Sequence, residues 1–244
     1  MSDQVNKFTF PARGFYLVAD KIAETDFFLS QLKNHAEYSQ EFGFYFSAFI
    51  SAARSITFSL QAVMSHYPGF EEWYPIRQEK LKQSSLARFF VNLRNHVQKV
   101  GGIPINHSGF MRDGIISNNQ FFVPTEDIKK VPDGEVIDLC HQYLVEVLHL
   151  IGECYRDFDV YVDPRAIFTS KGLEKLGWTI EDLEESLGFP RGWTDIDSDD
   201  DRDQQRLRVL SRYGGDDLLE PFLENIRFVL RRLTNKPIGA GWQN

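Results

Sequence analysis

The 244-residue chain has little cysteine, no excess of positive charge and no strong catalytic or metal-binding motif. Cys140 and Cys154 are too few for a disulfide framework, and the first thirty residues lack a basic start followed by an apolar stretch, so we expect a cytoplasmic protein. The net charge of -8 argues against broad non-specific binding to nucleic acid, although a local basic patch is compatible with it. Phenylalanine, in contrast, is abundant, and its 21 residues can supply a sizeable aromatic core.

Charge is scarce in one long stretch of the chain. Between Glu41 and Glu71 the only formal charge is Arg54, inside a helical pattern that runs from Phe42 to Tyr67. The five serines and the arginine in this run disfavour a membrane span and indicate a helix buried in a bundle, so we expect no membrane partner. Arg54 has two interpretations: part of a polar site or dimer seam, or a structural arginine satisfied by a carboxylate and backbone carbonyls.

The same helix has a large-residue side and a small-residue side. At the angular spacing of an α-helix, its phenylalanines and aliphatic residues fall on one side. A ridge of serines spaced four residues apart runs along the opposite side, made of Ser47, Ser51, Ser55 and Ser59. Such a ridge lets a neighbouring helix approach closely, and Arg54 lies at its edge.

Apolar periodicity and helix-stop signals predict an all-α bundle of four to five helices over residues 1–160. Met1–Ala19 is expected to be extended or irregular. Proline, asparagine and glycine in Ile103–Val123 predict a small irregular or β-hairpin insert. Pro68-Gly69 and Gly101-Gly102 are helix stops. The predicted helices are Lys21–Gln40, Phe42–Tyr67, Ser84–Val100 and Asp133–Phe158, with a short helical linker at Phe70–Lys82.

Residues 161–244 are predicted to form a C-terminal helical extension. Its elements look too short to build an independent core, so we expect an appendage of the bundle. A small helix is predicted at Thr179–Leu187 and a final amphipathic helix at Leu218–Leu233, with an acidic connector at Asp195–Asp203. Thr179–Arg191 also resembles a fragment of a helix-turn-helix, but too few basic residues accompany it to read DNA.

The predicted helix Ser84–Val100 carries a narrow apolar stripe with polar residues on its flanks. The stripe consists of Leu86, Phe89, Phe90, Leu93, Val97 and Val100. Arg94 and His96 lie on opposite flanks of it and cannot easily converge on one substrate atom within one monomer. His96 is expected to be a boundary histidine. Arg88, Asn92, Asn95 and Lys99 are predicted to point outward.

Neither of two further clusters fits a metal site, and no cofactor is predicted. His141, His149 and the two cysteines share one helix, whereas zinc needs pairs on one face and a second segment. The alternating aspartates that begin at Asp195 resemble the start of a calcium loop. The sixth position is Asp200 instead of glycine and the twelfth is Arg206 instead of glutamate, so the loop pattern fails.

Three segments together resemble the HEPN superfamily of helical bundles, and more narrowly a poorly characterised bacterial branch of it. They are Ala48-Phe49-Ile50-Ser51-Ala52-Ala53-Arg54-Ser55, then Trp73-Tyr74, then Phe89-Phe90-Val91-Asn92-Leu93-Arg94-Asn95. The resemblance covers roughly Lys21–Asp159 and implies a four- or five-helix bundle that commonly dimerises. Many active members cleave RNA without a metal, using an arginine, a following polar residue and a histidine four to six positions further on. The arginine would hold the phosphate and the histidine would move the 2′-hydroxyl proton.

This chain matches only the first half of that catalytic pattern. Arg94 and Asn95 fit it, but the histidine positions are Lys99, Val100 and Gly101. An ammonium group is a poor general base at neutral pH. The resemblance therefore favours a non-catalytic, homodimeric binding or regulatory protein of stress or phage defence.

In that favoured interpretation Arg54, Arg94, Asn95 and Lys99 would line a seam for an anionic ligand such as RNA or a nucleotide. One alternative is a divergent metal-independent ribonuclease that uses Arg94 with His96 or His107. Another is a structural partner subunit that contacts a protein through its acidic C-terminal region.

Overall fold

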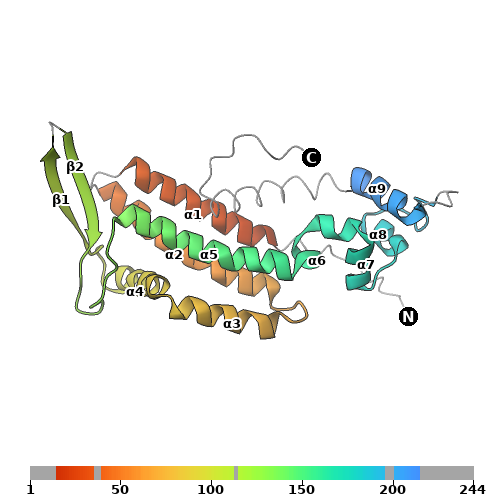
Figure 1. Ribbon diagram of the computed structural model, residues 1–244, viewed down its shortest axis with the longest axis horizontal. Coiled ribbons are helices and arrows are strands. Elements are labelled where there is room, and N and C mark those ends of the chain that lie inside the picture. The colour runs from red at the N-terminus through yellow and green to blue at the C-terminus, as the bar shows by residue number, and fades with distance from the viewer. Residues whose placement is uncertain (1–14, 36–39, 113–114, 196–200, 215–244) are drawn as a thin grey trace. The chain divides into compact units, whose positions relative to one another are not determined.

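The computed structural model of the chain describes residues 15–35, 40–112, 115–195 and 201–214. Among these residues the fold is a helical bundle with one antiparallel hairpin and a helical C-terminal part, which confirms the predicted all-α class (Figure 1). The chain forms two compact units. One is Leu17–Ile151, and the other contains the described residues from Gly152 onward together with Phe15 and Tyr16.

The first unit is built on long helices: α1 (Tyr16–Asn34), α2 (Gln40–Met64), α3 (Phe70–Gln83), α4 (Ser85–Lys99) and most of α5 (Val136–Asp157). The predicted positions of α2, α4 and α5 agree with these bounds to within a few residues. One expectation was wrong: Tyr16–Ala19 is helical instead of irregular. The predicted helical linker Phe70–Lys82 is helical as expected, as the 14-residue helix α3. Gly69, with φ +81°, precedes α3 and makes the predicted turn after α2.

The predicted insert is a β-hairpin of β1 (Ile105–Arg112) and β2 (Ile115–Phe122), paired from Ile105 with Phe122 to Arg112 with Ile115. Phe122 anchors it to the bundle because its ring meets Phe89 at 4.8 Å and Phe46 at 5.9 Å between centroids. Phe90 joins α4 to two other helices through Phe49 and through a parallel stack on Tyr143. The abundant phenylalanines therefore form the core that connects α2, α4, α5 and the hairpin.

The end of α4 departs from its predicted stripe. The helix ends at Lys99, and Val100 is 70% exposed instead of packed with the other stripe residues. At the other end, Ser84 caps α4 by accepting a hydrogen bond from the backbone N–H of Ala87 at 3.1 Å. The Ser84 hydroxyl also donates to Oε2 of Glu146 at 2.7 Å, which ties the start of α4 to α5.

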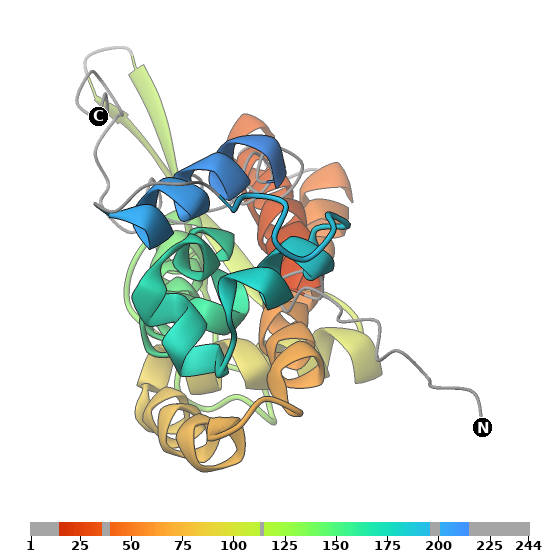
Figure 2. The ribbon, with the colours of Figure 1, turned by 90° about the vertical axis from the view of Figure 1, so that its right-hand side faces the viewer.

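The second unit has a hydrophobic core of its own, contrary to the expectation that its elements were too short for one. The core residues are Ile167, Leu173, Ile180, Leu183, Leu207 and Leu210. They come from the 3₁₀ helix η2 (Pro164–Phe168) and from α7 (Ser170–Leu176), α8 (Ile180–Ser186) and α9 (Arg202–Gly214); the short helix α6 (Asp159–Val162) precedes them. In Figure 2, α9 is the blue helix of this unit, and it packs against η2 and α8. The predicted helix Leu218–Leu233, and residues 196–200 of the acidic connector, lie outside the described residues.

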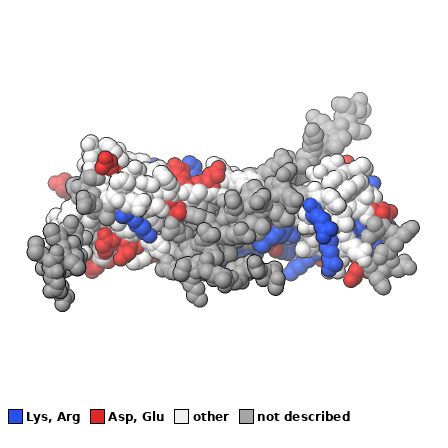
Figure 3. All heavy atoms as spheres, turned by 90° about the horizontal axis from the view of Figure 1, so that it is seen from above, with Lys and Arg blue, Asp and Glu red and all other residues white. Residues whose placement is uncertain are grey.

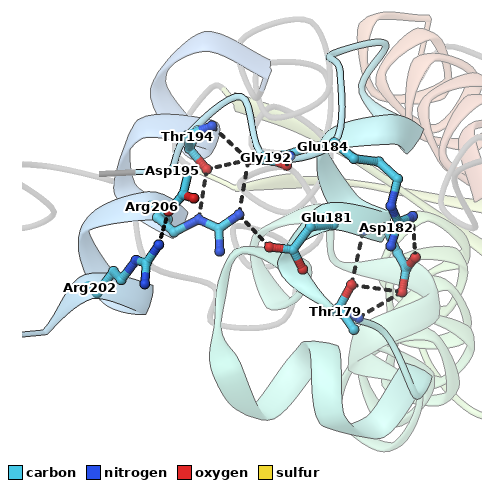
Figure 4. Close-up of polar contacts among 10 residues, drawn as sticks. Thr179, Glu181, Asp182, Glu184, Gly192, Thr194, Asp195, Arg202 and Arg206 are labelled. Carbon is cyan, nitrogen blue, oxygen red and sulfur yellow. Dashed lines mark hydrogen bonds and ion pairs between the residues drawn. The ribbon is translucent and has the colours of Figure 1, made fainter. Parts of the chain in front are cut away.

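A buried ion network closes this second core (Figure 4). Glu184 on α8 is fully buried, and its carboxylate accepts hydrogen bonds from the backbone N–H groups of Gly192 and Thr194 at 2.5 and 2.8 Å. Arg206 on α9, 8% exposed, donates to Glu184 at 3.2 Å and to Glu181 at 2.6 Å. One buried carboxylate therefore holds both the loop after α8 and the helix α9.

Candidate functional site

Four helices of the first unit enclose a cavity of about 260 Å³. Each helix contributes at least one polar side chain to it, and the remaining wall is apolar. The lining residues are Arg54 and Thr57 of α2; Tyr74, Gln78, Leu81 and Lys82 of α3; Ala87, Arg88, Val91 and Asn92 of α4; and Tyr143 and Val147 of α5. A concave, partly apolar site with a few convergent polar groups is the usual form of a small-molecule pocket.

Arg54 is the half-buried cation of this cavity. Its Nη1 donates to the hydroxyl of Thr57 at 2.9 Å, and its guanidinium carbon lies 4.3 Å from the ring centroid of Phe58. No carboxylate of the described residues lies within ion-pair distance of it. The guanidinium is thus held in place by a hydroxyl and a ring, while its charge has no anionic partner in this part of the chain.

Two tyrosines face the same space with their phenols kept neutral. Burial raises the pKa of Tyr143 to about 12, and it also raises the pKa of Tyr74, although the positive charge of Arg54 acts in the opposite direction on both. Tyr74 donates a long hydrogen bond of 3.4 Å to the carbonyl oxygen of Thr57. Tyr143 is 4% exposed, and its hydroxyl makes no hydrogen bond to any described residue. At neutral pH both groups remain hydrogen-bond donors.

The charged residues in the lining of the cavity are all basic. Lys82 and Arg88 are exposed and join Arg54 in the lining, which contains no aspartate or glutamate. Lys82 makes only a distant contact, 3.8 Å, with the exposed Glu79. On the face drawn in Figure 3, both acidic and basic side chains of the described residues are visible. A lining whose only charged groups are basic suits an anionic ligand.

The other residues predicted to form the anionic seam lie away from this cavity. Arg94, Asn95 and Lys99 are on α4 but do not line it. Arg94 is half-buried; its Nη1 lies 3.4 Å from Oδ1 of Asn95, and its Nε is buried without a hydrogen-bond partner among the described residues. Lys99 is exposed at the last residue of the helix. The structure thus brings Arg54 together with Arg88 and Asn92, which the sequence analysis placed only on the outward side.

His96 is buried at the bundle edge and paired with an acid. Its Nδ1 lies 2.9 Å from both carboxylate oxygens of Asp127, in the segment between β2 and α5. The Thr125 hydroxyl, which donates at 2.7 Å, and then the hydrogen bond with His96 hold the pKa of Asp127 below its usual value. An aspartate in this position fixes the ring orientation of the histidine. Neither His96 nor His107, which is on β1, lines the Arg54 cavity.

The described part of the chain contains neither a metal-binding cluster nor a membrane-spanning helix. Within it, no group of three or more histidine, cysteine, aspartate or glutamate side chains could hold a metal ion. Cys140 and Cys154 are free and buried, and burial raises the pKa of both thiols. Of the helices described, none combines the length and hydropathy needed to cross a membrane.

The sequence analysis missed most of the cavity lining. Tyr143 follows the helical spacing of the apolar residues of α5, so it reads as a core residue. Its hydroxyl was the one feature that could have indicated a site, because a buried phenol usually has a hydrogen-bond partner. Arg88 and Asn92 carried no signal beyond being polar on the outward side of α4.

Comparison with known proteins gives one family match. A family model described as bacteriophage lambda protein ea47 matches residues 17–129, which is less than half of the 244-residue chain. No curated protein and no solved structure matches. The matched segment contains α2, α3 and α4, which provide three walls of the Arg54 cavity, and it ends before α5. Over residues 17–129 the chain is therefore similar to the family of phage lambda protein ea47.

Proposed function

We propose that this chain is a non-catalytic, homodimeric binding or regulatory protein that holds an anionic ligand in the Arg54 cavity. The observation that carries the proposal is Arg54 itself: a half-buried cation facing a cavity, without a carboxylate partner among the described residues. Leaving such a charge unpaired is costly, and an anion from solution would satisfy it. The HEPN-like assignment belongs to this proposal and favours RNA or a nucleotide as ligand. The similarity to a phage family supports a phage-related setting.

Binding of anions should depend on Arg54 and not on Arg94. Anions that bind the native protein are first identified by the rise in its thermal unfolding midpoint. We expect Arg54→Gln to weaken the affinity for each of these anions about 10-fold or more, because charge-assisted hydrogen bonds contribute about 1.5–3 kcal/mol. Arg94→Gln is the matched control, since Arg94 is also half-buried but does not line the cavity. Titration calorimetry with uridine monophosphate, a short RNA, phosphate and benzoate measures both variants. Equal losses in the two variants would contradict the proposal.

The homodimer is supported by the outer face of α2. Phe44 and Phe58 on this helix are 64% and 53% exposed, and they flank the serine ridge predicted to admit a second helix. We expect sedimentation velocity to show a dimer at micromolar concentration and Phe44→Ser to shift it toward monomer. Phe27→Ser is the control, because Phe27 is also an exposed phenylalanine, at 54%, but lies on α1. A native protein that sediments as a monomer at all concentrations would rule out this part of the proposal.

A divergent metal-independent ribonuclease is the second candidate, and the pairing of His96 with Asp127 is the observation that favours it. An acid-oriented histidine can act as a general base. On this hypothesis the protein cleaves RNA in EDTA, and Arg94→Ala and His96→Ala each lower the rate by at least about 100-fold. Asp127→Asn should give a smaller loss, because it changes the orientation of the ring and not the ring itself. No cleavage over a range of RNAs would leave binding as the function.

A further inference from the structure

We propose that the ligand of the Arg54 cavity is a small organic acid with a single ring, whose carboxylate is held jointly by Arg54 and the hydroxyl of Tyr143. This inference rests on the proposed function, since it takes the cavity to be a binding site, and it narrows the anionic ligand to one chemical class. It follows from three properties of the cavity: its size, the placement of its cations and the unpartnered phenol.

The size of the cavity limits the ligand. At about 260 Å³ the cavity lies just below the range of about 300–1,000 Å³ that is usual for small-molecule pockets. A nucleotide or an RNA chain would have to extend out of such a cavity into solvent. A single ring that bears one acid group matches its size more closely.

The cations favour one negative charge inside the cavity. Arg54 is half-buried, whereas Lys82 and Arg88 are exposed at the rim, where water already solvates them. A single interior guanidinium matches a carboxylate, which it can bind through two parallel hydrogen bonds. A phosphate dianion would bring a second charge into a space lined by neutral tyrosines and aliphatic side chains.

Tyr143 supplies the second polar contact. Its side chain is more than nine-tenths buried, lines the cavity and has a hydroxyl without a hydrogen bond to the described residues. Because burial keeps the phenol protonated, the hydroxyl donates to an oxygen of the ligand. The positive charge of Arg54 acts on Tyr143, so the two groups are within electrostatic reach of each other. Val91 and Val147 provide apolar wall for a ring.

The test uses benzoate as the probe, with benzamide, phenyl phosphate and uridine monophosphate as comparisons, in titrations of the full chain. We expect benzoate to bind at least 10-fold more tightly than each of the other three. Tyr143→Phe should weaken benzoate about 10-fold while leaving the ligand-free thermal midpoint at or above that of the native protein, because the removed hydroxyl has no partner to lose. Tyr155→Phe, on the same helix but outside the cavity lining, is the control and should leave the affinity unchanged.

The outcomes separate this inference from the function on which it rests. If phenyl phosphate or uridine monophosphate binds more tightly than benzoate and still requires Arg54, the ligand class is wrong and the proposed function stands. If Tyr143→Phe binds benzoate as the native protein does, the joint contact is wrong. If no anion binding depends on Arg54, the inference and the proposed function fail together.

Discussion

Gly172→Ala is expected to destabilise the C-terminal unit by about 3 kcal/mol or more, the largest effect of a single methyl group that we anticipate in this protein. A Cβ atom at Gly172 in α7 would lie 1.7 Å from the carbonyl oxygen of Ala166 and 2.6 Å from its carbonyl carbon. Both are backbone atoms of η2, so a side-chain rotation cannot relieve the clash. Denaturant unfolding of the full chain, combined with hydrogen exchange of α7 to α9, measures the effect.

Gly43→Ala is the matched control for this substitution. A Cβ at Gly43, inside α2, would meet only Cδ1 of Ile103 at an ordinary 3.7 Å. Because glycine costs about 0.5–1 kcal/mol relative to alanine within a helix, this variant should be slightly more stable than the native protein. If Gly172→Ala proved as harmless as Gly43→Ala, the close approach of η2 to α7 would be wrong.

Glu184→Gln is expected to lower the stability of the same unit by about 3 kcal/mol. The amide keeps the size of the side chain but turns one acceptor into a donor facing the N–H groups of Gly192 and Thr194. It also leaves the buried Arg206 with one carboxylate instead of two. Thermal unfolding and hydrogen exchange of α9 report the loss.

Glu181→Gln tests whether the burial of a carboxylate, and not only its charge, determines how much it stabilises this network. Glu181 also binds Arg206, at 2.6 Å, but its side chain is 34% exposed, so we expect a loss of about 1 kcal/mol or less. An effect of Glu181→Gln as large as that of Glu184→Gln would show that burial of the carboxylate is not what matters.

Low pH should also destabilise the C-terminal unit through protonation of Glu184. Burial alone would raise the pKa of this carboxyl, but the hydrogen bonds from Thr194, Gly192 and Arg206 outweigh it and hold the pKa below its ordinary value. The resulting stabilisation is complete above the unfolded pKa of about 4.3 and is lost as the pH falls through the lower folded value. Glu184→Gln should remove this part of the acid dependence.

The long elements of the first unit were predictable because their signals are local. The apolar run of α2, the turn at Pro68-Gly69 and the stripe on α4 each follow from spacing within one segment. The α9 helix was missed for the opposite reason. It buries few apolar residues, chiefly Leu207 and Leu210, and they pack only because η2, α7 and α8 assemble beneath them.

The candidate site was predictable only in part. Arg54 stands out in sequence because a charge in an apolar helix must be satisfied, and this remains its distinguishing property in the structure. The cavity around it depends on how four helices pack, which no single segment encodes. Tyr143 shows the difference: its place in an apolar stripe predicted burial correctly, while its open hydroxyl becomes visible only with its neighbours in place.

The join between α3 and α4 has a consequence for the width of the cavity. The two helices are separated by one residue, Ser84, which ends the first and caps the second. Any change in the angle between α3 and α4 therefore requires a change in the backbone torsions of Ser84. Its hydroxyl bond to Glu146 fastens that pivot to the wall formed by α5. Two walls of the cavity are thus joined by a single-residue hinge, which a side-chain hydrogen bond fastens to a third wall.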